Sequence, residues 1–269
     1  MFKFNSKKIT AVCLIVSAVL IFNFPFYCLA GQNTGVTAKA ALVIDAKTKK
    51  VIYKKNPDLR LPAASTVKIL AALIVFERIQ LDAKVRISER AAGITPTKVN
   101  LTQGAYYKAE DLLKAFLMNS ANDAGVALAE AVAGTEFKFA QLMNIRAREL
   151  SAKNSFFLNA TGLPETNKKQ YSTPHDLAMF MGEFLKHKKL IEIIKTKEGV
   201  IVGSDGKEIN LRNHNKMLWR NDCGLVGKTG FTRKAKHCFL GFYIKSGRKF
   251  IVSMQGSRKI WDDLTDLAR

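Results

Sequence analysis

A serine and a lysine stand three positions apart in the segment PAASTVKIL, at the start of a strongly apolar run. The hydroxyl of Ser65 is a poor nucleophile until a base removes its proton, and Lys68 can reach it because residues i and i+3 share one helix face. A lysine serves as a base near neutral pH when burial or a second cation lowers its pKa. We therefore predict that Ser65 is a nucleophile and that Lys68 is its general base.

The Ser-x-x-Lys spacing is weak evidence by itself in a chain this rich in lysine. It occurs twice more, from Ser204 to Lys207 and from Ser246 to Lys249, and both copies fall in predicted hairpin turns. Only the Ser65 copy opens a predicted buried helix, whose N-terminal N–H groups would lie near an oxyanion that develops on a substrate.

Two further polar motifs could belong to the same site. Ser120 and Asn122 in MNSANDAG fit a polar helix cap, or else a hydroxyl that relays a proton beside an amide that holds a substrate carbonyl. Lys228-Thr229-Gly230 in GLVGKTGFT fits a basic strand with a bulge, or else a strand edge that pairs with an extended peptide and binds its carboxylate.

Hydrophobic periodicity predicts the elements that must position these residues. AALVIDAKTKKVIYKKN is typical of a strand, a turn and a strand, and STVKILAALIVFERIQ is typical of a helix that runs through the core. Helical patterns follow over residues 109–150 and in STPHDLAMFMGEFLKHKK, where Ser172 and Thr173 are capping candidates. GVIVG and KEINLRN predict a hairpin, GLVGKTGF, HCFLGFYIK and RKFIVSMQG predict three strands, and WDDLTDLAR predicts a last short helix.

This order of strands, helices and strands predicts an α+β fold. Because neither terminal set of strands makes a sheet by itself, we expect the first hairpin and the last three strands to form one five-stranded antiparallel sheet. The buried helix would pack on the face of that sheet, and the other helices would form a helical insert. We expect a single catalytic domain over residues 38–269.

The N-terminal segment predicts export. Lys3, Lys7 and Lys8 precede the uncharged stretch ITAVCLIVSAVLIFNFPFYCLA, so we interpret residues 1–30 as a signal peptide cleaved after Ala30. An uncleaved membrane anchor is the alternative. Either interpretation places the domain outside the cytoplasm, in the periplasm, at the cell surface or in the medium. There, the formal net charge of +21 would favour anionic cell-wall polymers or lipid headgroups over nucleic acid, although a solvated basic surface also fits the scattered lysines.

Metal and disulfide chemistry have little support in the sequence. The four histidines form no metal-ligand pattern, so we predict no metal. Two cysteines lie beyond the N-terminal segment, Cys223 and Cys238, and they could form one disulfide or remain two unpaired thiols.

The motifs and their flanking segments resemble a known family. PAASTVKIL, NSANDAGVALAEAVAG, NATGLP followed by YSTPHDLA, RNHNKML and GKTGFT are together similar to the low-molecular-mass penicillin-binding proteins, the D-alanyl-D-alanine carboxypeptidases, from about Ala38 to the C-terminus. The resemblance implies a β-lactamase/transpeptidase-like fold and no cofactor. It also implies a serine hydrolase that removes the terminal D-Ala from peptidoglycan stem peptides through an acyl-enzyme, and that binds penicillin and other β-lactams covalently.

The resemblance further implies a role for each motif residue. Ser65 would be the nucleophile, Lys68 the base and Ser120 the proton relay. Backbone N–H groups of Ser65 and Phe231 would form the oxyanion hole. The implied substrate-binding residues are Asn122, Lys228, Thr229, Gly230 and Phe231. Relatives often use an arginine near the last strand to bind the terminal carboxylate, and Arg258 is the one nearby here.

Two other functions would use the same motif order. A class A-like β-lactamase would need a loop glutamate to position water, for which Glu165 is the one candidate. Ala121 in place of the aspartate of S-D-N favours the carboxypeptidase instead. A non-catalytic cell-wall-binding relative would have no need for an intact Ser65, Lys68 and Ser120.

Overall fold

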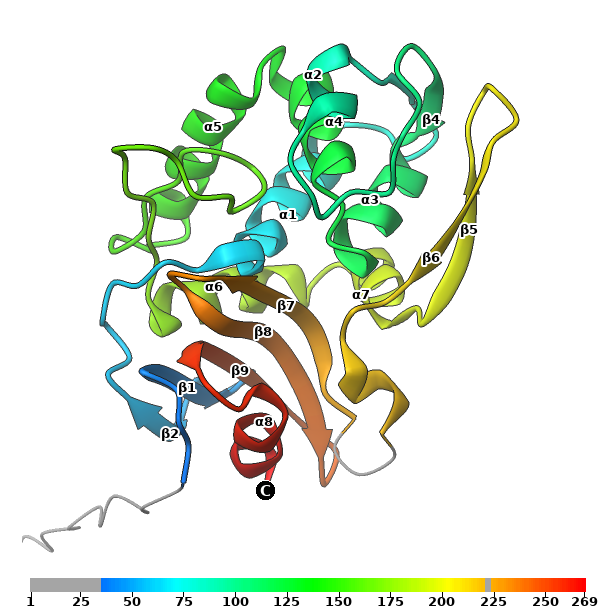
Figure 1. Cartoon of the computed structure of the whole chain (residues 1–269). Helices are drawn as coiled ribbons and strands as arrows, with labels where there is room; N and C mark the ends of the chain where they lie inside the picture. Colours follow the sequence, from blue (N-terminus) through cyan, green and yellow to red (C-terminus); the bar gives the residue numbers. More distant parts are fainter. Residues whose placement is uncertain (1–34, 221–223) are drawn as a thin grey trace, which may run out of the picture. The chain divides into compact units, whose positions relative to one another are not determined.

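Five antiparallel strands form the central sheet of the protein (Figure 1). The computed structural model describes residues 35–220 and 224–269, so the predicted signal peptide and Cys223 lie outside the described residues. The strands follow one another across the sheet in the order β2-β1-β9-β8-β7. Their bounds are β1 Ala40–Asp45, β2 Val51–Lys55, β7 Val226–Thr232, β8 Lys236–Lys245 and β9 Arg248–Ser257. The first hairpin and the last three strands therefore share one sheet, as predicted.

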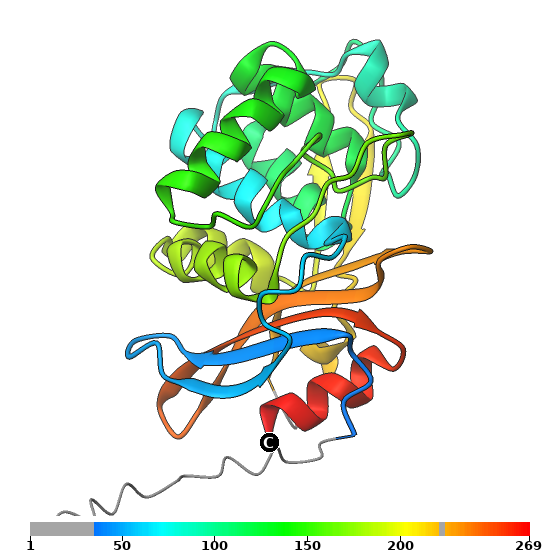
Figure 2. The same ribbon diagram turned by 90° about the vertical axis from the view of Figure 1, so that its left-hand side faces the viewer.

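Helices cover both faces of this sheet (Figure 2). Helix α6, Pro174–Phe184, packs on one face, and α8, Ile260–Ala268, packs on the other. The inner strands are buried on both sides, which explains why β1 has the almost continuously apolar sequence AALVID rather than an alternating one.

The position of the buried helix differs from the prediction. Helix α1, Lys68–Arg78, does not make the main contact with the sheet; α6 does. Helix α1 lies behind α6 and is surrounded by α3, α4, α5 and α6. Because other helices cover it, its sequence is apolar almost all round.

The remaining elements form the predicted helical insert and its connections. They are η1 Ala64–Val67, β3 Lys84–Arg86, α2 Glu89–Gly93, β4 Tyr106–Lys108, α3 Ala109–Met118, α4 Asn122–Ala133, α5 Glu136–Glu149, α7 Lys188–Lys195, β5 Glu198–Val202, β6 Glu208–Arg212 and η2 Lys216–Trp219. Strands β5 and β6 pair as the predicted hairpin. The helix predicted to continue past His187 instead ends at Phe184, and α7 begins after an extended residue at His187. Among the described helices, none has the length and apolar character that crossing a membrane requires.

Helix α6 has the cap that its sequence predicts. The Thr173 hydroxyl accepts a hydrogen bond from the backbone N–H of Asp176 at 3.1 Å, and Pro174 occupies the first helical position. Because α6 lies between the sheet and α1, this cap fixes one end of the contact between the two layers.

Loss of this cap should destabilise the protein. We expect Thr173→Ala to lower the free energy of unfolding by about 1 kcal/mol, because one N–H at the helix start loses its acceptor. Urea unfolding of the variant and the wild type measures the difference. Thr173→Ser keeps the hydroxyl and is the control, so equal losses in the two variants would contradict a capping role.

Candidate active site

The junction of η1 and α1 carries the first motif. Ser65 is half-buried in η1, and Lys68 is the first residue of α1 and is fully buried. Residues i and i+3 eclipse one another in a 3₁₀ turn, so the spacing places both side chains on one side of the chain. The Ser65 hydroxyl donates a hydrogen bond of 3.4 Å to the carbonyl oxygen of Thr161. The other two Ser-x-x-Lys copies lie in the β5–β6 and β8–β9 turns, as predicted.

The Lys68 ammonium group meets the second motif. It donates to the Ser120 carbonyl oxygen at 2.5 Å, to the Ser120 hydroxyl at 3.2 Å and to the Asn122 side-chain oxygen at 2.7 Å. The ring of Phe116 lies 5.1 Å from the ammonium nitrogen. The structure therefore brings together three predicted site residues from two segments that are about 50 positions apart.

Ser120 holds an unusual backbone conformation between α3 and α4. Its φ angle is 59°, in the left-handed region that costs a residue with a side chain about 1–2 kcal/mol. Lys68 contacts both the carbonyl and the hydroxyl of this residue, which offsets that cost. The Asn122 amide nitrogen donates to the Thr95 carbonyl at 2.9 Å, so the segment is fixed on both sides.

The environment lowers the pKa of Lys68 well below the ordinary lysine value of 10.5. Loss of hydration on burial is the main cause, and repulsion from Lys228 adds to it. Asp123 and Glu136 act in the opposite direction without cancelling the shift. At neutral pH, a larger fraction of Lys68 is therefore neutral and free to accept a proton than of an exposed lysine.

Strand β7 places the third motif beside Ser65. Lys228 is 1% exposed, its ammonium donates to the Thr229 carbonyl at 2.8 Å, and burial lowers its pKa to about 7. A Cβ atom at Gly230 would lie 2.8 Å from the Ser65 backbone nitrogen, so only glycine lets the strand approach this closely. The next residue, Phe231, is exposed, and its ring lies 4.7 Å from that of His237.

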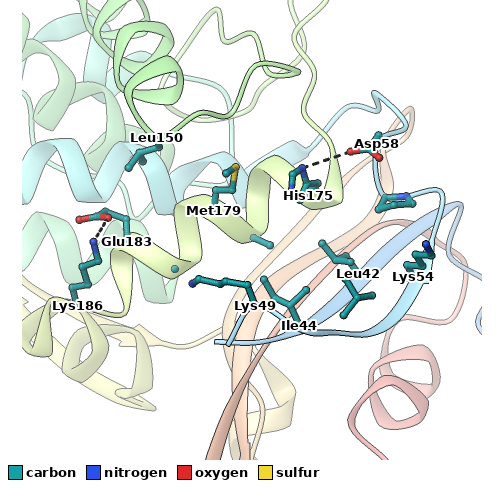
Figure 3. A pocket seen from close by; sticks show the side chains of 14 residues that line it. Leu42, Ile44, Lys49, Lys54, Asp58, Leu150, His175, Met179, Glu183 and Lys186 are labelled. Atoms are coloured by element: carbon teal, nitrogen blue, oxygen red, sulfur yellow. Dashed lines mark hydrogen bonds and ion pairs between the residues drawn. The ribbon is translucent and has the colours of Figure 1, made fainter. Parts of the chain in front are cut away.

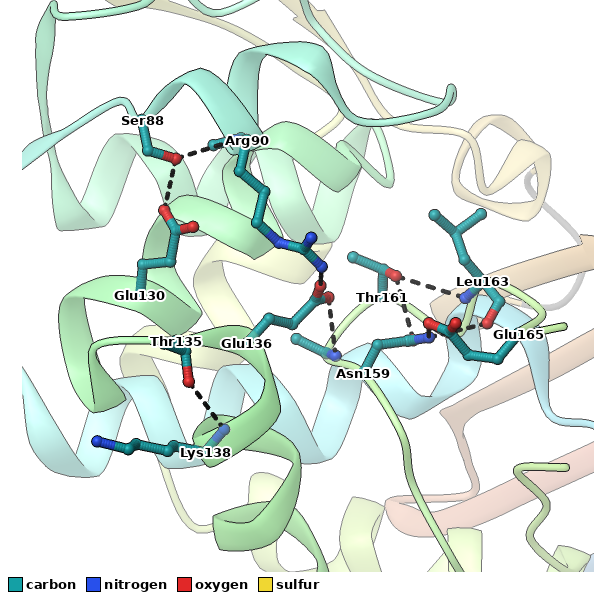
Figure 4. Close-up of polar contacts among 12 residues, drawn as sticks. Ser88, Arg90, Glu130, Thr135, Glu136, Lys138, Asn159, Thr161, Leu163 and Glu165 are labelled. Carbon is teal, nitrogen blue, oxygen red and sulfur yellow. Dashed lines mark hydrogen bonds and ion pairs between the residues drawn. The ribbon is translucent and has the colours of Figure 1, made fainter. Parts of the chain in front are cut away.

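A loop over residues 159–165 forms another side of the site (Figure 4). A Cβ atom at Gly162 would lie 2.1 Å from the Ala64 carbonyl oxygen, and its φ of 80° also favours glycine. The buried Asn159 accepts from the Gly162 N–H at 2.8 Å and donates to the Glu165 carboxylate at 3.0 Å. Glu165 thus bonds within the loop.

An ion pair between the exposed Arg90 and the buried Glu136 supports this loop from behind (Figure 4). Glu136 is 6% exposed, accepts a hydrogen bond from the backbone N–H of Ala160 at 3.3 Å and pairs with Arg90 at 2.8 Å. Arg90 comes from α2 and Glu136 from the start of α5, so elements of the helical insert position the loop that contacts Ser65.

Sequence reasoning did not assign a role to Thr161 or His214, which the structure places at the site. Thr161 supplies the carbonyl that accepts from Ser65. His214 follows β6, and loss of hydration together with repulsion from Lys228 and Lys68 lowers its pKa to about 4. Thr161 lies in NATGLP and His214 in RNHNKML, two of the segments that carry the family resemblance. That resemblance was the one feature of the sequence that could have indicated them.

The sequence analysis also named Arg258 and Cys238, and Cys238 packs against Ala64, the residue before Ser65. Arg258 has an exposed side chain, and its backbone N–H donates to the Thr37 hydroxyl at 3.0 Å. Cys238 is buried, and burial raises the pKa of its thiol to about 12. Among the described residues, no group of three or more His, Cys, Asp or Glu side chains could hold a metal ion.

Comparison with known families agrees with this arrangement of motifs. Residues 29–257 match the model of peptidase family S11, described as D-alanyl-D-alanine carboxypeptidase. The chain belongs to this carboxypeptidase family. The D-alanyl-D-alanine carboxypeptidase DacF of Bacillus subtilis is 35% identical over 226 residues, which cover 82% of this chain and 57% of DacF. This chain therefore spans little more than half the length of that relative.

A further relative and two solved structures are also similar to this chain. DacB2 of Mycobacterium tuberculosis is 26% identical over 236 residues, or 86% of this chain and 80% of DacB2. A crystal structure of a D-alanyl-D-alanine carboxypeptidase from that organism superposes with a TM-score of 0.81 at 25% identity, covering 86% of this chain and 89% of the other. A mutant of the Streptomyces K15 DD-transpeptidase superposes with a TM-score of 0.79 at 25% identity, covering 86% and 96%. The predicted β-lactamase/transpeptidase-like fold is confirmed.

Burial of Lys228 should make stability depend on pH. The unfolded state keeps the proton of this lysine up to about pH 10.5, whereas the folded state releases it near pH 7, so stability rises as the pH rises above 7. In a Lys68→Met background, we expect a gain of about 1–2 kcal/mol in unfolding free energy between pH 7 and 8.5. Urea unfolding at the two pH values measures the gain.

The control for this prediction is the double variant Lys68→Met/Lys228→Met, which should lose the gain. The window from pH 7 to 8.5 avoids the titrations of His214 and Cys238, whose folded and unfolded pKa values lie outside it. Equal gains in the single and double variants would show that Lys228 titrates normally in the folded protein.

Proposed function

We propose that this protein is a serine-type D-alanyl-D-alanine carboxypeptidase that removes the terminal D-Ala from peptidoglycan stem peptides. The observation that carries the proposal is the fully buried Lys68, whose ammonium contacts Ser120 and Asn122 one turn from Ser65. A wall-binding protein would gain nothing from burying a lysine at this position, because burial of an amine is costly and its main chemical result is a lower pKa.

The first half of the reaction forms the acyl-enzyme. Neutral Lys68 takes the proton from the Ser65 hydroxyl, and the oxygen attacks the carbonyl carbon of the penultimate D-Ala. The backbone N–H groups of Ser65 and Phe231 bind the oxyanion of the tetrahedral intermediate. Ser120 relays the proton from Lys68 to the nitrogen of the terminal D-Ala as the peptide bond breaks, and D-Ala leaves.

The second half hydrolyses the acyl-enzyme, as water attacks the ester carbonyl and Ser65 recovers its proton through Lys68. Substrate binding falls to the other motif residues. Lys228 and Thr229 bind the terminal carboxylate of the peptide, Gly230 leaves room for the peptide backbone, and Asn122 holds a peptide carbonyl.

We also infer where the enzyme acts. Residues 1–30 act as a signal peptide, or as an uncleaved anchor that holds the protein at a membrane, and residues 38–269 form the catalytic domain outside the cytoplasm. The match to a family of D-alanyl-D-alanine carboxypeptidases supports this location, because stem peptides ending in D-Ala-D-Ala belong to the cell wall. β-Lactams are expected to acylate Ser65 as covalent inhibitors.

Replacement of the nucleophile or the base should abolish the reaction. We expect Ser65→Ala and Lys68→Met each to lower kcat for D-Ala release from a peptide ending in D-Ala-D-Ala by about 10³-fold or more. An enzyme-coupled D-Ala assay measures the rate, and circular dichroism checks that the variants fold. A folded Ser65→Ala protein with near wild-type activity would overturn the assignment of the nucleophile.

Reaction with benzylpenicillin separates this function from that of a β-lactamase. We expect a long-lived adduct on the wild type, detected by intact-protein mass spectrometry, and no adduct on Ser65→Ala. Glu165→Gln should leave the adduct lifetime unchanged, because the Glu165 carboxylate bonds to Asn159 within its loop. Rapid penicillin hydrolysis that Glu165→Gln abolishes would instead support the β-lactamase alternative.

A further inference from the structure

Two cavities, one away from the candidate active site and one bordering it, differ in how many of their charged side chains already have partners. The cavity between α6 and strands β1 and β2 has a volume of about 600 Å³ (Figure 3). Several of its charged groups are already engaged: Lys186 pairs with Glu183 at 2.7 Å, and Lys49 donates to a backbone carbonyl at 2.8 Å. This cavity offers little free charge to a ligand.

The second cavity, of about 400 Å³, lies close to the nucleophile. Its walls come from the η1 turn, from residues 162–171 and from the end of β7 with the turn that follows. Ala63, Ala64 and Val67 line it from η1, and Thr232 lines it from β7. The cavity thus borders both the segment that carries Ser65 and the strand that carries Lys228.

Four cations and one carboxylate surround this cavity. The carboxylate is Glu165, which bonds to Asn159. The cations are Arg60, Lys168, Lys169 and Lys234. The Arg60 guanidinium donates a hydrogen bond of 2.7 Å to the side-chain oxygen of Asn154 and stacks over the ring of Tyr171. Among the described residues, none of the ion pairs involves the three lysines, so their charge is available to an anion.

The direction of a bound peptide connects this cavity to the reaction. Strand β7 is the outer strand of the sheet, so its free edge can pair with an extended substrate. If the terminal carboxylate lies at Lys228 and Thr229 and the scissile carbonyl lies at Ser65 and Phe231, as in the proposed function, the preceding residues of the peptide run toward Thr232. The cavity begins there.

We propose that this cavity is a subsite for the residue that precedes D-Ala-D-Ala, and that it selects a side chain ending in a carboxylate. The inference rests on the proposed function. Lys168, Lys169 and Lys234 attract the carboxylate, while Ala63, Ala64 and Val67 contact the aliphatic part of the side chain. Lys234 lies in the turn RKAK that follows β7.

Two matched peptides test this specificity. Both are Nα-acetyl-L-lysyl-D-Ala-D-Ala, with the lysine side chain acetylated in one and succinylated in the other, so that the second has one more methylene group and a terminal carboxylate. At low salt, we expect kcat/KM for D-Ala release to be at least tenfold higher with the succinylated peptide. The ratio should fall toward one in Lys168→Gln/Lys169→Gln/Lys234→Gln, while the rate with the acetylated peptide stays within about twofold of wild type.

The control for the general effect of charge is Lys47→Gln/Lys50→Gln/Lys195→Gln. It removes three exposed lysines that do not line this cavity, so it should keep the wild-type ratio. A wild-type ratio near one, or an unchanged ratio in the first triple variant, would overturn the subsite. Failure of the proposed function looks different, because neither peptide would release D-Ala. In that event, calorimetric binding to Ser65→Ala still decides the inference: tighter binding of the succinylated peptide supports it, and equal binding overturns it.

Discussion

The candidate active site depends on a lysine that the fold keeps away from water. Lys68 is fully buried, and a buried ammonium group is stable only when its hydrogen bonds are replaced. Ser120 and Asn122 supply oxygen partners, but neither supplies a formal negative charge, and the second buried lysine, Lys228, opposes the positive charge further. The arrangement therefore stabilises the amine without holding its proton tightly, which is what a general base requires.

The rest of the fold keeps these groups in place. Helix α1 lies among other helices and behind α6, so the position of Lys68 is fixed by packing on all sides. Glycines at positions 162 and 230 let a loop and the outer strand approach the turn that carries Ser65 to distances that any side chain would prevent. The Arg90–Glu136 ion pair supports the loop from behind. Residues far from the nucleophile thus determine the geometry around it.

The sequence was sufficient to predict most of the elements and the fold, whereas the roles of the motif residues stay predictions. Periodicity indicated the strands of the sheet, and the apolar run after Ser65 distinguishes this Ser-x-x-Lys copy from the two copies in turns. Periodicity shows which face of a helix is apolar but not which neighbour covers it, so α1 was placed on the sheet where α6 lies. The contributions of Thr161 and His214 depend on contacts across long sequence separations, which spacing along the chain does not reveal.

The central claim is that Lys68 loses its proton far more readily than an ordinary lysine. NMR titration of protein labelled with ¹³C at the lysine side-chain ε carbon measures this directly, with the Lys68 signal assigned from the spectrum of Lys68→Met. We expect a Lys68 pKa well below 10.5 in the free protein. A Lys68 signal that titrates near 10.5 would show that the amine stays protonated at neutral pH, and it would contradict the assignment of Lys68 as the base.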